Sequence, residues 1–225
     1  MPMIILVPQG AEYKAVCRGL SRVTTAKPTV MPIPVGIKPL ITYLHKLQEQ
    51  NQLVNPLSRV LVMGLCGSLN PSYSVGDIVL YQDCVYQGKL QKCDRLLTTE
   101  ICSRISDKVT LVKSLTSDRV ICSAAEKLHL GEKFGADVVD MEGFAVLDFF
   151  HQLGVSIAML RVVSDDCRHD IPDLTSAISA DGSLKPLSLA LRLIQQPIAA
   201  TRLIRGSLQG LKVLENLIES LIRAY

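Results

Sequence analysis

Short apolar runs alternate with amphipathic segments along most of the chain, and this alternation is the feature that most restricts its fold. The runs are rich in β-branched residues, as buried strands are; they are Met3–Val7, Val60–Gly64, Val75–Val85, Val109–Lys113, Ala136–Asp140 and Val155–Val163. The segments between them have helical spacing; they are Ala11–Leu20, Gly36–Gln50, Arg95–Ile105, Ala124–Phe134 and Glu142–Leu153. Such alternation is typical of βαβ units. We therefore predict an α/β fold, a three-layer α/β/α arrangement with a central, mostly parallel, twisted sheet.

The C-terminal part of the chain has a different character. We predict a single domain over residues 1–225, in which residues 174–225 form a helical extension. Two helices are expected there, Leu184–Gln196 and Ile198–Arg223, separated by Pro197, with the second loosened near Gly206 and Gly210. The last helix carries one apolar stripe, made of Leu203, Ile204, Leu208, Leu211, Leu214, Leu217, Ile218, Leu221 and Ile222. The stripe indicates docking on the core or on a neighbouring subunit, and contact with a membrane surface is the alternative.

Composition argues against several function classes. Aromatic residues make up 4 % of the chain, Trp is absent, and the Lys and Arg behind the net charge of +3 are scattered, so we expect no nucleic-acid partner. Seven Cys occur without CxxC spacing, which favours free thiols in a reducing cytosol and no metal site. The N-terminal segment MPMIILVPQG has no basic n-region, and no run is long enough to span a bilayer, so a cytoplasmic protein is expected.

Chemically useful residues follow the predicted strands. Parallel sheets bind ligands beyond the carboxyl ends of their strands. This rule selects four junctions: Pro8–Glu12, Gly64–Ser68, Asp140–Glu142 and Ser164–Asp166. In the second, GLCGS, the turn around Gly64, Cys66 and Gly67 would let backbone amides approach a ligand, and a purely structural turn explains it equally well. It is not GxGxxG, so a dinucleotide cofactor is not expected.

The acidic residues at the other junctions each allow two interpretations. Glu12 and Glu142 precede or begin helices, where an acid stabilises the helix dipole. Alternatively, Glu142 accepts two sugar hydroxyls above an apolar floor formed by Met141, and Glu12 acts as a general base. Ser164, Asp165 and Asp166 could cap a following helix, but Pro172 lies close behind and makes that interpretation weaker.

Taken together, these motifs resemble the nucleoside phosphorylase and nucleosidase superfamily. The resemblance rests on Glu12, VMGLCGSLNP, VGDIV, VDMEG and RVVSD, and it covers nearly the whole chain. A closer similarity is to the hopanoid-associated subgroup, which includes adenosylhopane nucleosidases. It rests on SDRVICSAAEK at Ser117–Lys127, on GADVVDME at Gly135–Glu142 and on RVVSD at Arg161–Asp165. The tail DGSLKPL at Asp181–Leu187 is also similar to that subgroup.

The resemblance implies cleavage of the N-glycosidic bond of a purine nucleoside, without a cofactor, by a homo-oligomer. Asp165 would protonate or hydrogen-bond purine N7, with Ser164 orienting it. Burial beside Val162, Val163 and Cys167 would favour its protonated form. Glu142 would hold the ribose hydroxyls with Met141 against the sugar, and Glu12 would activate water. Gly64, Cys66 and Gly67 would complete the substrate site.

The chain departs from the phosphorylases at the glycine loop. Val62 and Leu65 stand where phosphate-binding relatives carry Arg and Ser, which favours hydrolysis over phosphorolysis. Arg18 and amides near Gly64 and Gly67 are the substitute phosphate ligands. The base-binding segment of relatives reads SGD, whereas this chain has Ser123-Ala124-Ala125, so the base-recognition residues stay unassigned. A non-catalytic nucleoside-binding protein is the remaining alternative. The subgroup and the apolar stripe suggest a lipid-linked nucleoside, adenosylhopane, as substrate.

The alternation of side chains along a strand separates the two adjacent acids. If Arg161–Val163 is extended, Asp165 and Asp166 point to different sides, and only one faces the ligand. The RVVSD register selects Asp165 as the proton donor, and Asp166 is then predicted to be a capping or surface acid.

Overall fold

The fold was analysed in a computed structural model that describes residues 3–50, 59–105, 108–173, 190 and 193–224. Its strands are β1 (Met3–Pro8), β2 (Thr29–Ile33), β3 (Arg59–Ser68), β4 (Ile78–Tyr86), β5 (Lys89–Lys92), β6 (Val109–Thr116), β7 (Val138–Asp140) and β8 (Ser156–Asp165). Its helices are α1 (Ala11–Ser21), α2 (Ile37–Glu49), α3 (Arg95–Arg104), α4 (Ala124–Phe134), α5 (Gly143–Gln152) and α7 (Pro197–Arg223). Every strand and helix predicted up to Val163 is confirmed, with boundaries shifted by a few residues.

The sheet is mixed and part of it closes on itself into a ring, a feature that the predicted three-layer arrangement around a mostly parallel sheet did not include. Strand β3 pairs in parallel with β1 and β8 and antiparallel with β7 at Gly67 and Ser68. From β7 the pairing continues through β6 and β4 and returns to β8, so β3, β7, β6, β4 and β8 form a ring. Within the described residues five strand pairings are parallel and three antiparallel. The α/β class is thus confirmed, and the sheet is a mixed one in which parallel pairings outnumber antiparallel pairings.

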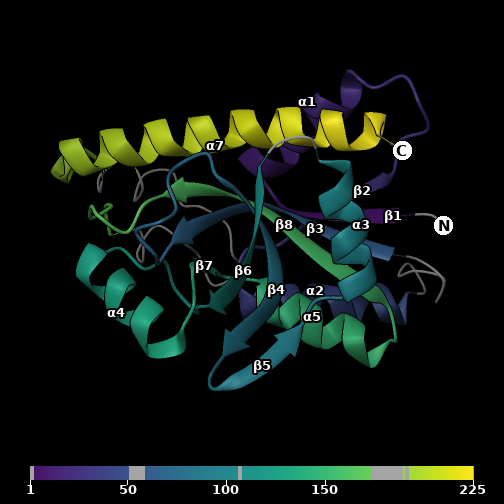
Figure 1. The fold of residues 1–225 in the computed structure, drawn as a ribbon, viewed down its shortest axis with the longest axis horizontal. Helices are drawn as coiled ribbons and strands as arrows, with labels where there is room; N and C mark the ends of the chain where they lie inside the picture. Colours follow the sequence, from purple (N-terminus) through teal and green to yellow (C-terminus); the bar gives the residue numbers. More distant parts are fainter. Residues whose placement is uncertain (1–2, 51–58, 106–107, 174–189, 191–192, 225) are drawn as a thin grey trace.

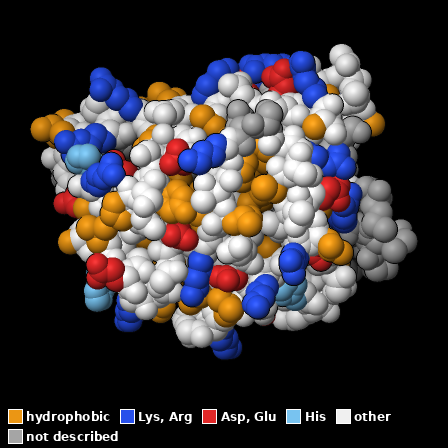
Figure 2. Space-filling view, viewed as in Figure 1, with side chains coloured by type: hydrophobic (Ala, Val, Ile, Leu, Met, Phe, Trp, Pro, Cys, Tyr) orange, Lys and Arg blue, Asp and Glu red, His pale blue; other side chains and the backbone are white. Residues whose placement is uncertain are grey.

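Helices cover both faces of the sheet (Figure 1). Alternate residues of β8 belong to two separate cores: Ile157, Met159 and Val163 pack with α2 and α5, whereas Ala158, Leu160 and Val162 pack with α1, α3 and α7. Because β8 is buried on both faces, its sequence is apolar throughout, as expected for an interior strand. On the face shown in Figure 2, basic and acidic side chains are interspersed around apolar side chains near the centre.

Helix α7 crosses the top of the molecule in Figure 1 as one continuous helix. The predicted loosening at Gly206 and Gly210 is therefore wrong. A Cβ at Gly206 would overlap the carbonyl oxygen of Ser164, so this glycine lets α7 lie against the end of β8. The second half of the apolar stripe is buried on the core, as predicted; it comprises Leu214, Leu217, Ile218, Leu221 and Ile222. Most of the predicted helix Leu184–Gln196 lies outside the described residues.

The first half of α7 leaves apolar side chains in solvent. Ile198, Ile204 and Leu208 are 71 %, 46 % and 62 % exposed. None of the helices described here is both long and apolar enough to cross a membrane. Half of the stripe is therefore explained by docking on this chain's own core.

Candidate active site

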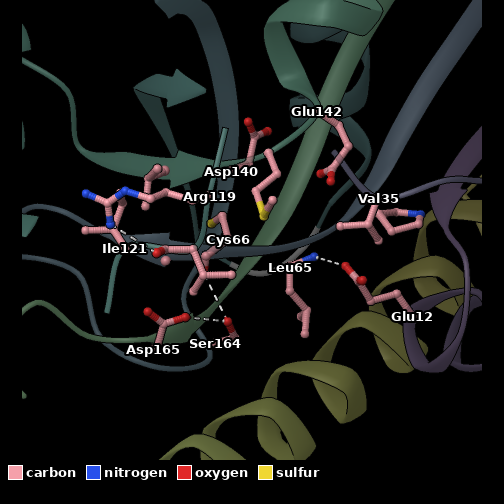
Figure 3. A pocket seen from close by; sticks show the side chains of 15 residues that line it. Glu12, Val35, Leu65, Cys66, Arg119, Ile121, Asp140, Glu142, Ser164 and Asp165 are labelled. Carbon is pink, nitrogen blue, oxygen red and sulfur yellow. Dashed lines mark hydrogen bonds between the residues drawn. The ribbon is translucent and has the colours of Figure 1, made fainter. Parts of the chain in front are cut away.

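A cavity of about 180 Å³ opens beyond the carboxyl ends of β1, β3, β7 and β8 (Figure 3). All four junctions selected from the sequence contribute to its wall. The lining residues are Pro8, Glu12, Val35, Leu65, Cys66, Gly67, Arg119, Val120, Ile121, Val139, Asp140, Met141, Glu142, Ser164 and Asp165. The structure thus brings together the predicted site residues Glu12, Met141, Glu142, Ser164 and Asp165, with Cys66 and Gly67 between them.

Glu12 lies in the first turn of α1, directly after β1. Its Oε1 accepts a hydrogen bond of 2.6 Å from the backbone N–H of Leu65. Burial of the carboxyl group raises the pKa of Glu12 to about 7, although Arg161 and the Leu65 amide act in the opposite direction. A carboxyl group with this pKa can act as a base near neutral pH.

Glu142 stands at the N-terminus of α5 and is 4 % exposed. Its side chain does not cap the helix. Instead its Oε1 accepts a hydrogen bond of 2.9 Å from the N–H of Gly36, and Oε2 lies 3.6 Å from Nη2 of Arg161. Burial raises the pKa of Glu142, with Arg161 opposing and Asp140 adding to the rise. The helix-dipole explanation therefore applies poorly to this residue.

Asp140, two residues earlier, is the carboxylate that caps α5. Its Oδ1 accepts hydrogen bonds from the Thr116 hydroxyl at 3.0 Å and from Gly143 N–H at 3.1 Å. Its Oδ2 lies 3.4 Å from Nη2 of Arg161. Asp140 is thus satisfied within the protein, whereas Glu142 keeps acceptor capacity for a ligand.

Arg161 is a site residue to which the sequence motif RVVSD assigned no role. It is fully buried, and Nη2 pairs with both Asp140 and Glu142. Burial alone would lower the pKa of Arg161, but Asp140, Tyr81 and Glu142 raise it, so the guanidinium is always charged. Among the described residues, its Nε and Nη1 have no hydrogen-bond partner. Arg161 therefore places a permanent positive charge, with unused donors, behind the acidic end of the cavity.

The glycine segment is a strand and not the turn predicted from GLCGS. Gly64–Ser68 completes β3, with a register shift against β8 between Cys66 and Gly67. A Cβ at Gly64 would overlap Nη1 of Arg161 and lie 2.7 Å from Oε1 of Glu12, so Gly64 makes room for these side chains and does not line the cavity itself. Gly67 has a comparable role, because its Cβ would lie 2.8 Å from Oδ2 of Asp165.

Asp165 ends β8 at the other end of the cavity (Figure 3). The Ser164 hydroxyl donates to its Oδ1 at 2.8 Å and contacts the Cys66 carbonyl at 3.2 Å, in line with the predicted orienting role of Ser164. The predicted apolar surroundings are incomplete, because the ammonium of Lys127 in α4 forms an ion pair with Oδ2. Lys127 is a polar neighbour that sequence analysis missed.

Asp166 has the structural role predicted for it. Its Oδ1 accepts hydrogen bonds from the N–H groups of Arg168 at 2.9 Å and His169 at 3.0 Å. Although partial burial acts in the opposite direction, these bonds and the His169 ring lower the pKa of Asp166. The carboxylate of Asp166 holds the loop after β8 and does not line the cavity.

Two further predictions concern ligand recognition. Arg18, the predicted phosphate ligand, does not line the cavity, and its Nε pairs with Glu215 of α7 at 3.0 Å. The base-recognition residues, which the sequence left unassigned, are sought next to Asp165, where the segment Arg119–Ile121 before α4 lines the cavity. Ser123 instead caps α4, and Ala124 and Ala125 begin that helix.

Comparisons with known proteins agree with this architecture. Residues 55–194 match the family model of the Phosphorylase superfamily. The 5′-methylthioadenosine/S-adenosylhomocysteine nucleosidase of Campylobacter jejuni is similar in structure with a TM-score of 0.62 and 18 % identity, over 96 % of this chain and 99 % of that one. The same nucleosidase from Helicobacter pylori gives 0.70 and 14 %, over 100 % and 99 %. The futalosine hydrolase of Helicobacter pylori also gives 0.70 and 14 %, over 100 % and 98 %.

Identities this low establish a shared fold and no more. No curated protein matches the sequence closely enough to count as a relative. The enzyme class predicted from the sequence, a nucleosidase or nucleoside phosphorylase, is confirmed at the level of the superfamily.

Proposed function

The chain belongs to the phosphorylase superfamily, and from this premise we propose that it hydrolyses the N-glycosidic bond of a purine nucleoside and releases the free base. One observation carries the proposal: Glu12, Glu142 and Asp165 come from three different strand ends and line one cavity. Each of the three has an acid–base or hydrogen-bonding function that this reaction requires. Met141 and Cys66 form an apolar part of the cavity wall between these three acids.

Departure of the base begins the reaction. The bond between the ribose and the purine breaks more easily when a base nitrogen is protonated or hydrogen-bonded, because the leaving group then carries less negative charge. Asp165 would supply this proton or hydrogen bond, and it lies in the cavity wall beside Arg119–Ile121, which would contact the base. Ser164 holds the carboxylate in one orientation.

The ribose becomes positively charged as the base leaves. Glu142 would accept hydrogen bonds from its vicinal hydroxyls, and these bonds strengthen as positive charge develops on the sugar. Arg161 keeps Glu142 near the required position from behind, through the 3.6 Å contact. Met141 would pack against the sugar, as predicted from the sequence.

Glu12 would take the proton from the attacking water. Its Oε1 already accepts the Leu65 N–H, which fixes the carboxyl group over the cavity. The same bond argues for hydrolysis over phosphorolysis, because the amide is occupied by a carboxylate and cannot also bind phosphate. Glu12 and Glu142 together make this end of the cavity acidic. Among the described lining residues the cation is Arg119, which lies towards the Asp165 end and pairs with Glu126.

The finer substrate assignment is an adenine nucleoside, and a lipid-linked one, adenosylhopane, is the narrowest form of the proposal. Resemblance to the hopanoid-associated subgroup supports it, as do the exposed Ile198, Ile204 and Leu208 on α7. Structural neighbours include a nucleosidase from Borrelia burgdorferi bound to adenine, with a TM-score of 0.69 and 13 % identity. The homo-oligomeric state and the cytoplasmic location stay predictions.

Product analysis tests the proposal. We expect the protein to release adenine from adenosine or 5′-methylthioadenosine in phosphate-free buffer, together with the free sugar. Formation of a sugar 1-phosphate only when phosphate is added would select phosphorolysis. Calorimetric binding of these nucleosides without any base release would instead support a non-catalytic binding protein. For the lipid-linked assignment, adenosylhopane in detergent micelles should be cleaved faster than adenosine, and equal or slower cleavage would contradict it.

A further inference from the structure

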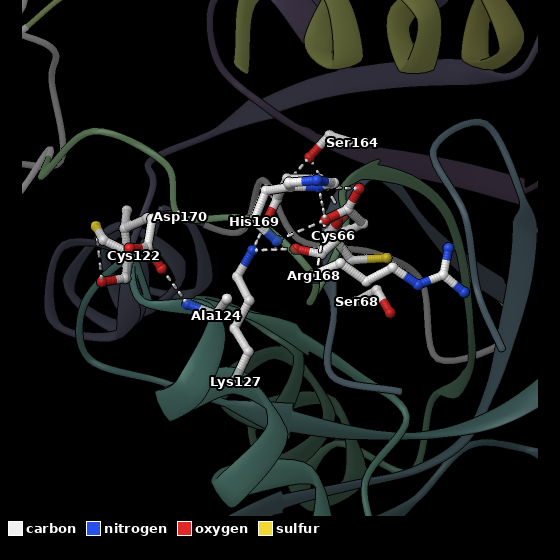
Figure 4. Close-up of polar contacts among 12 residues, drawn as sticks. Cys66, Ser68, Cys122, Ala124, Lys127, Ser164, Arg168, His169 and Asp170 are labelled. Atoms are coloured by element: carbon white, nitrogen blue, oxygen red, sulfur yellow. Dashed lines mark hydrogen bonds and ion pairs between the residues drawn. The ribbon is translucent and has the colours of Figure 1, made fainter. Parts of the chain in front are cut away.

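Lys127 is a fully buried lysine that the reaction as proposed above leaves without a function. It lies in the first turn of α4 and is 0 % exposed. Its ammonium forms an ion pair with Oδ2 of Asp165 and donates a hydrogen bond of 2.8 Å to the backbone carbonyl of Asp166 (Figure 4). Both partners belong to the end of β8 or the residue after it.

The fold gives little reason to bury a lysine here. Lysine is almost never fully buried unless it is paired, and replacing a buried ion pair with apolar residues is often neutral or stabilising. The start of α4 is held without it, because Ala124 N–H donates to Asp170 Oδ1 at 2.7 Å and the Ser123 side chain caps the helix. The lysine is therefore placed by a rigid helix end, and its partner is a residue of the cavity.

The carboxylate of Asp165 is surrounded by donors on both oxygens. Ser164 donates to Oδ1 and Lys127 to Oδ2, and Gly67 leaves room for Oδ2 at the cavity wall. Each carboxylate oxygen of Asp165 therefore accepts a hydrogen bond from a protein donor. A departing base needs a proton, however, and the acid closest to Asp165 is the Lys127 ammonium.

We propose that Lys127 is the positioning residue of Asp165 and the reservoir of the proton that Asp165 passes to the leaving base; this inference rests on the proposed function. As the bond between the sugar and the base breaks, its electron pair moves to the base. A base nitrogen takes one proton from Asp165, and Asp165 takes one from Nζ of Lys127. The ammonium becomes a neutral amine and regains its proton from solvent once the base has left.

The other charged groups near the pair do not replace Lys127 in this role. They are Arg119 and Glu126, which pair with each other, and Asp166, Arg168, His169 and Asp170 in the segment after β8. His169 contacts Asp166 and Arg168 donates to the Pro71 carbonyl, so neither is bonded to the Asp165 carboxylate. Within the described residues, Lys127 is the cation paired with Asp165.

The test compares the pH dependence of kcat in the full-length wild type and in Lys127→Met, a neutral variant of similar length. The probe is whichever of adenosine and 5′-methylthioadenosine the wild type cleaves faster. Without the lysine, Asp165 must take its proton from solvent, which becomes harder as the pH rises. We expect kcat to fall about 100-fold at pH 8 and less than about 10-fold at pH 5, with KM changed less than about 3-fold.

Asp165→Asn provides the reference for the same route. The double variant Lys127→Met/Asp165→Asn should show no larger fall in kcat than Asp165→Asn alone, because the two residues act in one proton path. Thermal unfolding followed by circular dichroism checks that each variant folds, and Lys127→Gln is a polar substitute if Lys127→Met does not.

Several outcomes overturn the proposal. A loss in Lys127→Met that is the same at pH 5 and pH 8 would show that the lysine only supports the structure, as would failure of both variants to fold. A loss below about 3-fold at pH 8 would show that Asp165 needs no reservoir. If the wild type itself releases no base, the proposed function fails and this inference fails with it; wild-type activity with a parallel variant profile overturns the role of Lys127 alone.

Discussion

The two ends of the cavity contain the same kinds of side chain in different proportions. At the end formed by β1, β7 and α5, the single guanidinium of Arg161 faces three carboxyl groups, those of Glu12, Asp140 and Glu142. At the other end, Lys127 faces the one carboxylate of Asp165. Burial raises the pKa of Glu12 and of Glu142, and the guanidinium of Arg161 offsets only part of this rise.

The difference in proportion suits the two ends to different steps. The acidic end has carboxyl groups that hold or take up protons near neutral pH, which a base for water requires. At the paired end, the carboxylate of Asp165 contacts a proton donor, the ammonium of Lys127. Substitutions at each end test whether the two ends have these different roles.

Asp165→Asn should have the largest effect, because the amide keeps the shape of the carboxylate but cannot pass a proton to the base. We expect kcat for adenine release to fall by about 10³-fold, within the range for a general acid. Asp166→Asn is the matched control, one residue away with the same chemical change, and should alter kcat by less than about 3-fold because an amide oxygen can still accept the N–H groups of Arg168 and His169. Equal losses in the two variants would mean that the proton donor has been assigned to the wrong acid.

Glu12→Gln should reduce kcat by about 10²-fold, through loss of the base that activates water. The pKa of Glu12 is about 7, and only the ionised form can accept a proton, so wild-type kcat should rise with pH through that value. Glu12→Gln should lack this rise. Stopped assays of adenine release between pH 5 and pH 9 provide both profiles. Persistence of the rise in the variant would assign it to another group, with Glu142 the first candidate.

The two glycines of β3 allow each end to be disturbed by a single methyl group. Gly64→Ala would press on Arg161 and Glu12, and Gly67→Ala on Asp165. Because both positions are buried, kcat should fall by about 10-fold or more in each variant. Gly64→Ala should also lower the free energy of unfolding by roughly 1–3 kcal/mol, because the guanidinium beside it is enclosed. Urea unfolding and kcat measurements separate the two effects. A Gly64→Ala variant as stable as the wild type would show that Arg161 has more freedom than the packing indicates.

Much of the fold and of the candidate site could be predicted because it depends on local sequence. The strands that precede Glu12 and Glu142, and the strand that ends at Asp165, are apolar runs rich in β-branched residues. Acids beyond the carboxyl ends of parallel strands meet at one sheet edge. The missed strands lack these signals. Strand β2 contains Pro32 and is only partly buried, and β5 is the polar run KLQK, joined to β4 by a hairpin turn at Gln87-Gly88 with positive φ at both residues.

The remaining features depend on contacts between distant segments. Closure of the ring needs β3 to pair with β7, whose residues lie about 70 positions later, and no periodicity encodes that pairing. Likewise, Lys127 is the last residue of SAAEK at the start of α4, where a lysine is expected on the surface. Its burial becomes evident only when α4 is placed against the end of β8. Arg161 lies in an apolar strand, where its three acidic neighbours come from other parts of the chain.

The smallest predicted effect concerns stability and again distinguishes the acidic end. The folded-state pKa of Glu12 is about 7, above the reference value of 4.5, so the folded protein binds more protons than the unfolded chain between these pH values. Stability should therefore decrease as the pH rises from 4.5 to 7, and the decrease should be complete above 7. Glu12→Gln removes the contribution of this residue. We expect the variant to unfold about 3 °C higher than the wild type at pH 8, the shift that roughly 1 kcal/mol produces in a chain of this size, and to match it at pH 4.5. Thermal unfolding at the two pH values measures this difference. Asp166→Asn should instead unfold at a lower temperature than the wild type at pH 8. The reason is that the folded protein lowers the pKa of Asp166, so its carboxylate stabilises the native loop at that pH.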